Sequence, residues 1–79
     1  MDKTTEEIAQ DYIAMGHSVT LITDIIAGNA MADNTAEDKQ DCVDRNVEHL
    51  VLMVAKDYWT NESMTAVNSA ISAGNGYTA

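Results

Sequence analysis

The chain has 79 residues, no proline, a single cysteine and thirteen acidic side chains against four basic ones, which gives a net charge of −9. A chain of this length forms one domain with a small core, and a lone cysteine excludes an internal disulfide. The negative charge disfavours direct binding of nucleic acid or of an anionic membrane, and it favours a protein partner with a basic surface.

The sequence predicts a single domain over residues 1–79, with 75–79 as an extended tail. No apolar stretch is long enough to span a bilayer, and the first residues lack the basic and apolar segments of a secretory signal. We therefore expect a soluble protein of the cytoplasm or, if the chain is viral, of the host cell cytoplasm or the virion.

The first predicted helix covers residues 5–27. Thr4 and Glu7 have the spacing of a capping box, and Gly28 follows the last apolar residue. A break at Gly16, with a new cap two residues later, is the alternative, but the apolar phase continues across this glycine. Steps of four and three predict the buried stripe Ile8, Tyr12, Met15, Val19, Ile22 and Ile26.

The second predicted helix covers residues 35–58, after a loop of small and polar residues. Asn34 and Thr35 are alternative caps, because an acidic residue stands three positions after each. The predicted core positions are Val43, Val47, Leu50, Val54 and Tyr58.

Three further apolar residues of this helix, Val51, Leu52 and Met53, are expected to point away from that core line. A chain this short has little mass with which to cover them. Their burial is worth on the order of 1.5 to 3 kcal/mol each, which a second copy of the chain could provide. The sequence thus predicts self-association through these three residues, into a dimer or a larger helical bundle.

A third, shorter helix is predicted over residues 62–73. Met64, Val67 and Ile71 recur at helical spacing, and the alanines among them allow close approach of a neighbouring helix. With no proline and few alternating β-branched residues, the sequence offers no case for a sheet. The expected fold is therefore all-α, with three helices in an antiparallel arrangement.

An acidic stripe follows one side of the second predicted helix. Its members, Glu37, Asp41, Asp44 and Glu48, step by four, three and four residues. Such a stripe could imitate a nucleic-acid backbone towards a basic protein, although an ordinary solvated helix face explains the same residues. Arg45 beside the stripe weakens the case for mimicry.

No catalytic, cofactor-binding or metal-binding motif is present. Cys42 and His49 are two helical turns apart, about 10.5 Å along the axis, which is too far for shared coordination of a metal within one chain. His17 has no neighbouring ligand in the sequence, and no phosphate loop or nucleophile motif occurs. We therefore expect a protein without enzymatic activity and without a cofactor.

The segments RNVEHL (45–50), KDYW (56–59), MTAVNSAI (64–71) and AG (73–74) resemble the carboxy-terminal part of small uncharacterised proteins from bacteriophage genomes. This resemblance covers less than half the chain and implies a viral origin without any activity. The expected function is that of a small acidic accessory factor that binds a host protein. The alternatives are a minor component of the virion, and an acidic DNA mimic that inhibits a host defence or nucleic-acid-binding protein.

Overall fold

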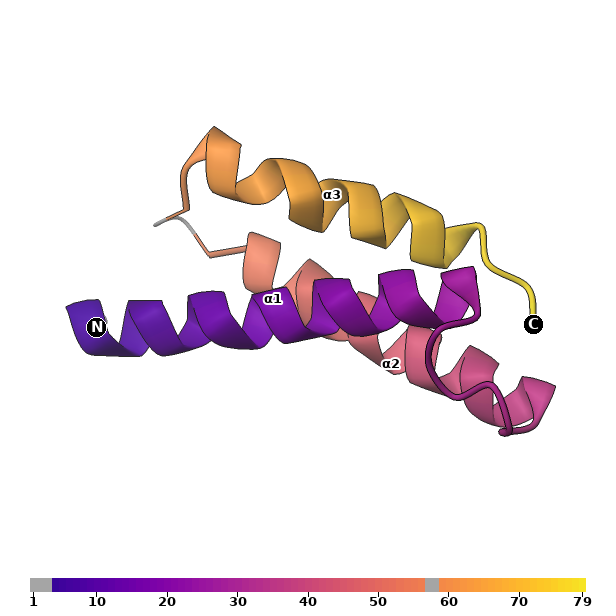
Figure 1. Ribbon diagram of the computed structural model, residues 1–79. Coiled ribbons are helices and arrows are strands. Elements are labelled where there is room, and N and C mark those ends of the chain that lie inside the picture. Colours follow the sequence, from indigo (N-terminus) through magenta and orange to yellow (C-terminus); the bar gives the residue numbers. More distant parts are fainter. Residues whose placement is uncertain (1–3, 57–58) are drawn as a thin grey trace.

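The computed structural model describes residues 4–56 and 59–79, which form three helices: α1 (Thr5–Ala27), α2 (Ala36–Val54) and α3 (Asn61–Asn75). α1 and α2 are antiparallel, and α3 returns alongside them in the direction of α1 (Figure 1). Each helix contacts the other two, and the molecule measures 41 × 19 × 18 Å. The predicted all-α antiparallel three-helix arrangement is confirmed.

The bounds and caps of α1 agree with the prediction. The Glu7 N–H donates to the Thr4 hydroxyl at 3.2 Å, and the Thr4 N–H donates to the Glu7 carboxylate at 3.3 Å, which completes the capping box. Gly28 ends the helix in the left-handed conformation, with φ of 83°, where a residue without Cβ is favoured. The helix passes Gly16 without a break, so the alternative of two shorter helices is wrong.

The buried line of α1 differs in part from the predicted stripe. Met15 and Ile22 are buried as expected, but Ser18 and Ile25 take the intervening positions. Val19 is only partly buried, and Tyr12 and Ile26 are exposed. Ser18 and Ile25 each stand one residue before the predicted Val19 and Ile26, and both sets have helical spacing. The packing of α1 against two other helices determines which set is buried.

α2 begins as predicted with Thr35 as its cap, whose hydroxyl accepts from the Asp38 N–H at 3.1 Å. It ends at Val54, so the predicted end at residue 58 is wrong. The Trp59 indole N–H donates to the Met53 carbonyl at 2.8 Å, which satisfies one of the carbonyls that a helix end leaves without an intrahelical partner. Tyr58, a predicted core residue, lies outside the described residues.

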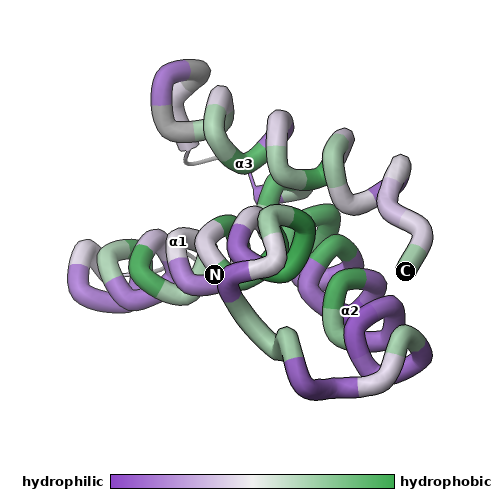
Figure 2. Tube along the Cα trace, turned by 45° about the vertical axis from the view of Figure 1, so that its right-hand side comes forward, coloured by the Kyte–Doolittle hydropathy of each residue, from purple (hydrophilic) through white to green (hydrophobic). Residues whose placement is uncertain are grey.

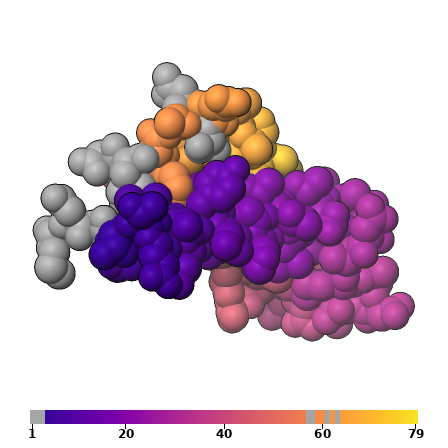
Figure 3. Space-filling view, turned by 60° about the vertical axis from the view of Figure 1, so that its left-hand side comes forward, coloured from indigo at the N-terminus to yellow at the C-terminus, as the bar shows by residue number. Residues whose placement is uncertain are grey.

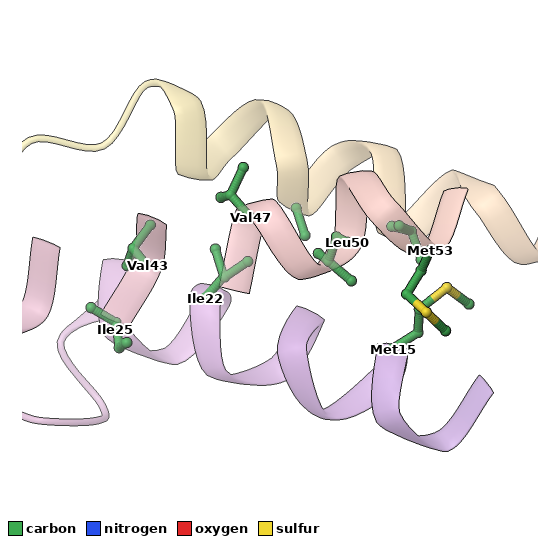
Figure 4. Close-up of a cluster of buried hydrophobic side chains, with 9 residues drawn as sticks. Met15, Ile22, Ile25, Val43, Val47, Leu50 and Met53 are labelled. Atoms are coloured by element: carbon green, nitrogen blue, oxygen red, sulfur yellow. The ribbon is translucent and has the colours of Figure 1, made fainter. Parts of the chain in front are cut away.

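The core lies between the three helices and is made of aliphatic and methionine side chains (Figure 4). Three α2 positions were predicted correctly, since Val43, Val47 and Leu50 are all buried, whereas Val54 is only partly buried. Among the described residues, the buried hydrophobic cluster consists of Met15, Ile22, Ile25, Val43, Val47, Leu50, Met53, Val67 and Ala70.

α3 extends one residue earlier and two residues later than predicted, and it lies close to α2 at its end. Gly74 is buried, and a Cβ there would overlap with Val47 Cγ2 and lie 3.4 Å from Val43 Cγ1. The predicted tail then packs back on α2. The Gln40 side chain donates to the Tyr77 carbonyl at 3.2 Å and accepts from the Ala79 N–H at 2.9 Å.

Hydrophilic residues concentrate on the outward side of the amino-terminal half of α2 (Figure 2). None of the helices in the described part of the chain combines the length and the apolarity that a membrane crossing requires. The carboxy-terminal half of α2 is more apolar and runs along α1.

Candidate interaction surfaces

Two of the three residues predicted to mediate self-association face away from the core. Val51 is 47% exposed and Leu52 is 63% exposed, whereas Met53 is only 8% exposed. The expectation that Met53 points outward is wrong, because it occupies the core position one turn after Leu50 and lies beside Met15 (Figure 4). We refer to Val51 and Leu52 as the α2 apolar pair.

The four residues of the acidic stripe, Glu37, Asp41, Asp44 and Glu48, are all exposed on α2. The first three line a surface depression together with Asp38 and Gln40, while Glu48 lies beyond it. The negative charge of the stripe is partly compensated by Arg45, which forms an ion pair of 2.8 Å with Asp41. The Gln40 side-chain amide donates a hydrogen bond of 3.0 Å to the Asp44 carboxylate. Two of its four carboxylates therefore have partners within α2.

His49 is engaged in packing α2 against α1. Its Nδ1 shares a hydrogen bond of 2.8 Å with the hydroxyl of Ser18, which is 5% exposed. A serine beside a histidine is the core of a nucleophilic dyad, but this hydroxyl is buried between the helices, where a substrate does not reach it. The bond instead satisfies two polar groups at the helix interface.

Cys42 is partly buried and lies next to Asn46, whose side-chain amide donates to the Cys42 carbonyl at 2.8 Å. Within residues 4–56 and 59–79, no three His, Cys, Asp or Glu side chains are arranged to hold a metal ion. Cys42 and His49 therefore act in separate local contacts.

An apolar groove at the amino-terminal end of α1 was missed by the sequence analysis. We call it the α1 groove; it is lined by Thr5, Ile8, Ala9, Tyr12, Ile13, Trp59 and Thr60. Tyr12 and Ile13 are 54% and 58% exposed, and the rings of Tyr12 and Trp59 lie 6.2 Å apart between centroids. Figure 3 shows the first turns of α1 at one end of the elongated molecule.

One signal in the sequence could have located this groove. The α1 positions that line it, at steps of three, one, three and one, form a continuous strip along the helix. The strip was not recognised because Tyr12 was predicted to be a core residue. The assignment followed from helical spacing alone, and α2 ends too early to cover the start of α1.

We compared the chain with family models, with curated proteins and with solved structures, and none of them matches it.

Proposed function

We propose that this protein acts without enzymatic chemistry, by binding other proteins. The observation that supports this function is the amount of large apolar surface left uncovered after the three helices have packed. Tyr12, Ile13, Val51 and Leu52 are each about half exposed or more. Burial of such side chains against a partner is favourable by on the order of 1 kcal/mol or more each.

Self-association through the α2 apolar pair is one part of this proposal. The pair lies near the carboxy-terminal end of α2, with the exposed Glu48 one turn before Leu52 and the exposed Lys56 beyond the end of the helix. An apolar contact with charged residues at its rim is the usual anatomy of an interface. This arrangement needs no contribution from Met53.

Sedimentation velocity over a range of protein concentrations tests this contact. We expect a reversible dimer in the wild type, a monomer after Leu52→Asp, and no change after Ile13→Asp, which places the same charge at an exposed position on α1. A strict monomer at tens of micromolar, unchanged by Leu52→Asp, would reject self-association.

The second part of the proposal is a basic protein as the external partner. The acidic stripe supports it, since all four of its residues are exposed and α1 and α3 contain no lysine or arginine. Replacing Asp41 and Asp44 by asparagine should weaken binding to a basic target and flatten its salt dependence. An unchanged affinity and salt dependence would contradict a role for the stripe.

Mimicry of DNA is the second candidate function, and the spacing of the stripe favours it. Its test is competition: the protein should displace nucleic acid from a basic DNA-binding protein, and the paired asparagine variant should not. The Arg45–Asp41 ion pair reduces the negative charge available for such mimicry.

The resemblance to bacteriophage proteins supports a viral accessory factor that binds a host protein, with a minor virion component as the alternative. Mass spectrometry of purified particles separates the two. The chain should be absent from particles if it acts only inside the cell, and present at a fixed copy number if it is structural.

A further inference from the structure

We propose that the α1 groove binds a basic amphipathic helix of a partner protein. This inference rests on the proposed binding function and identifies the chemistry of the partner. It arises from three properties of the groove: its length along α1, its aromatic wall and the charges around it.

The length of the groove suits a helix. Its α1 residues run from Thr5 to Ile13, which spans about 12 Å, or roughly two helical turns. The first turns of α1 extend beyond the end of α2, so α2 does not cover this face (Figure 1). An amphipathic helix that lies in such a groove contacts it through apolar residues at steps of three and four.

The wall of the groove is held in place before any partner binds. The Trp59 indole N–H donates to the Met53 carbonyl at 2.8 Å, which ties the indole to the end of α2. The Tyr12 ring lies against it at a tilt of 45°. A tethered aromatic pair loses little conformational entropy on binding, and aromatic residues are frequent energetic anchors in interfaces.

The net charge of −9 favours a basic occupant of the groove. Glu6 lies next to the groove on α1, and the first turn of α3 contributes Glu62, while α1 and α3 contain no lysine or arginine. Lys39 and Arg45 belong to the amino-terminal half of α2, which lies at the opposite end of the molecule, whereas the exposed Lys56 follows the end of α2 (Figure 1). Lysine or arginine residues that flank an apolar stripe would meet complementary charge here.

The same charges disfavour a second copy of the chain in the groove. Two copies that met through this surface would bring together two α1 helices, each with acidic side chains and no lysine or arginine. Like charges across an interface oppose association. The groove and the α2 apolar pair are therefore assigned different occupants.

The test uses the fluorescence of Trp59, which is the only tryptophan of the chain and lines the groove. The probe is a synthetic helix of about 18 residues, with leucine at steps of three and four and lysine elsewhere. Two control peptides replace either every leucine by serine or every lysine by glutamate. None of the peptides contains tryptophan.

We expect the lysine–leucine peptide to shift the emission of Trp59 to shorter wavelength and to saturate. Ile13→Asp should raise the dissociation constant at least about tenfold, because the aspartate would be desolvated against the leucines. Thr20→Asp, which adds the same charge at an exposed α1 position outside the groove, should leave the constant within about twofold. Both control peptides should bind at least about tenfold more weakly than the probe.

Three results would overturn the inference. The first is tight binding of the probe that Ile13→Asp leaves unchanged, and the second is equal binding of the glutamate–leucine peptide. The third is conversion of a wild-type dimer into a monomer by Ile13→Asp, which would assign the groove to a second copy. If the wild type binds no probe but still dimerises through Leu52, the groove proposal fails while the proposed binding function remains.

Discussion

The contact between Gly74 and Val47 predicts opposite effects for two glycine-to-alanine substitutions. A Cβ on Gly74 would overlap with Val47 Cγ2, and it would also lie 3.4 Å from Val43 Cγ1 and 3.6 Å from Ile22 Cγ2. A Cβ on Gly16, within α1, would meet no atom within 4 Å. The same chemical change therefore tests packing at one site and helix propensity at the other.

The expected magnitudes follow from these surroundings. An added methyl group in a packed core typically costs about 1 to 3 kcal/mol, and alanine in a helix gains up to about 1 kcal/mol over glycine. Gly74 is the penultimate residue of α3, so it gains less than an interior position. Gly74→Ala should thus lower the free energy of unfolding by about 1 to 2 kcal/mol, and Gly16→Ala should raise it by about 0.5 to 1 kcal/mol.

Urea and thermal unfolding, followed by circular dichroism at 222 nm, measure both changes. For a domain of this size, 1 kcal/mol corresponds to a shift of about 4 to 8 °C in Tm. Removing the overlapping methyl group should rescue part of the loss, so Val47→Ala combined with Gly74→Ala should be more stable than the sum of the single effects. A Gly74→Ala protein as stable as the wild type, with no coupling to Val47→Ala, would refute the close approach.

Two further predictions concern the core and the interface between α1 and α2. Leu50→Ala should cost about 2 to 5 kcal/mol because Leu50 is fully buried, while Leu52→Ala should change stability by no more than about 0.5 kcal/mol in the monomer. Ser18→Ala should cost about 1 kcal/mol, because it removes the hydrogen bond to His49 Nδ1. Chemical unfolding measures these changes, and equal losses for Leu50→Ala and Leu52→Ala would contradict the assigned burial.

Helix starts and helix count could be predicted because they depend on local chemistry. The Thr4–Glu7 capping box, the Thr35 cap and the stop at Gly28 satisfy backbone groups within a few residues, so their spacing in the sequence is sufficient. The end of α2 could not be predicted in this way. The Met53 carbonyl at this end accepts a hydrogen bond from the Trp59 indole, and Trp59 lies beyond the helix. The sequence gives no local stop signal at this point.

The candidate surfaces were predicted less completely than the helices. The exposure of Val51, Leu52 and the acidic stripe follows from their angles relative to the core line of α2. Met53 was misplaced because steps of three and four from Leu50 are both compatible with a helix, and the sequence offers no means of choosing between them. The α1 groove was missed for the related reason that its existence depends on where α2 ends.

The sequence alone determined that the chain forms three helices, where α1 begins and ends, where α2 begins, and that its surface is acidic, because caps, periodicity and charge are local properties. Only the tertiary structure decided between neighbouring candidates for burial, such as Ile25 and Ile26 or Met53 and Val54. That choice depends on the rotation of each helix against two neighbours, on the close approach at Gly74 and on the bond from Trp59, and all of these join residues from different elements.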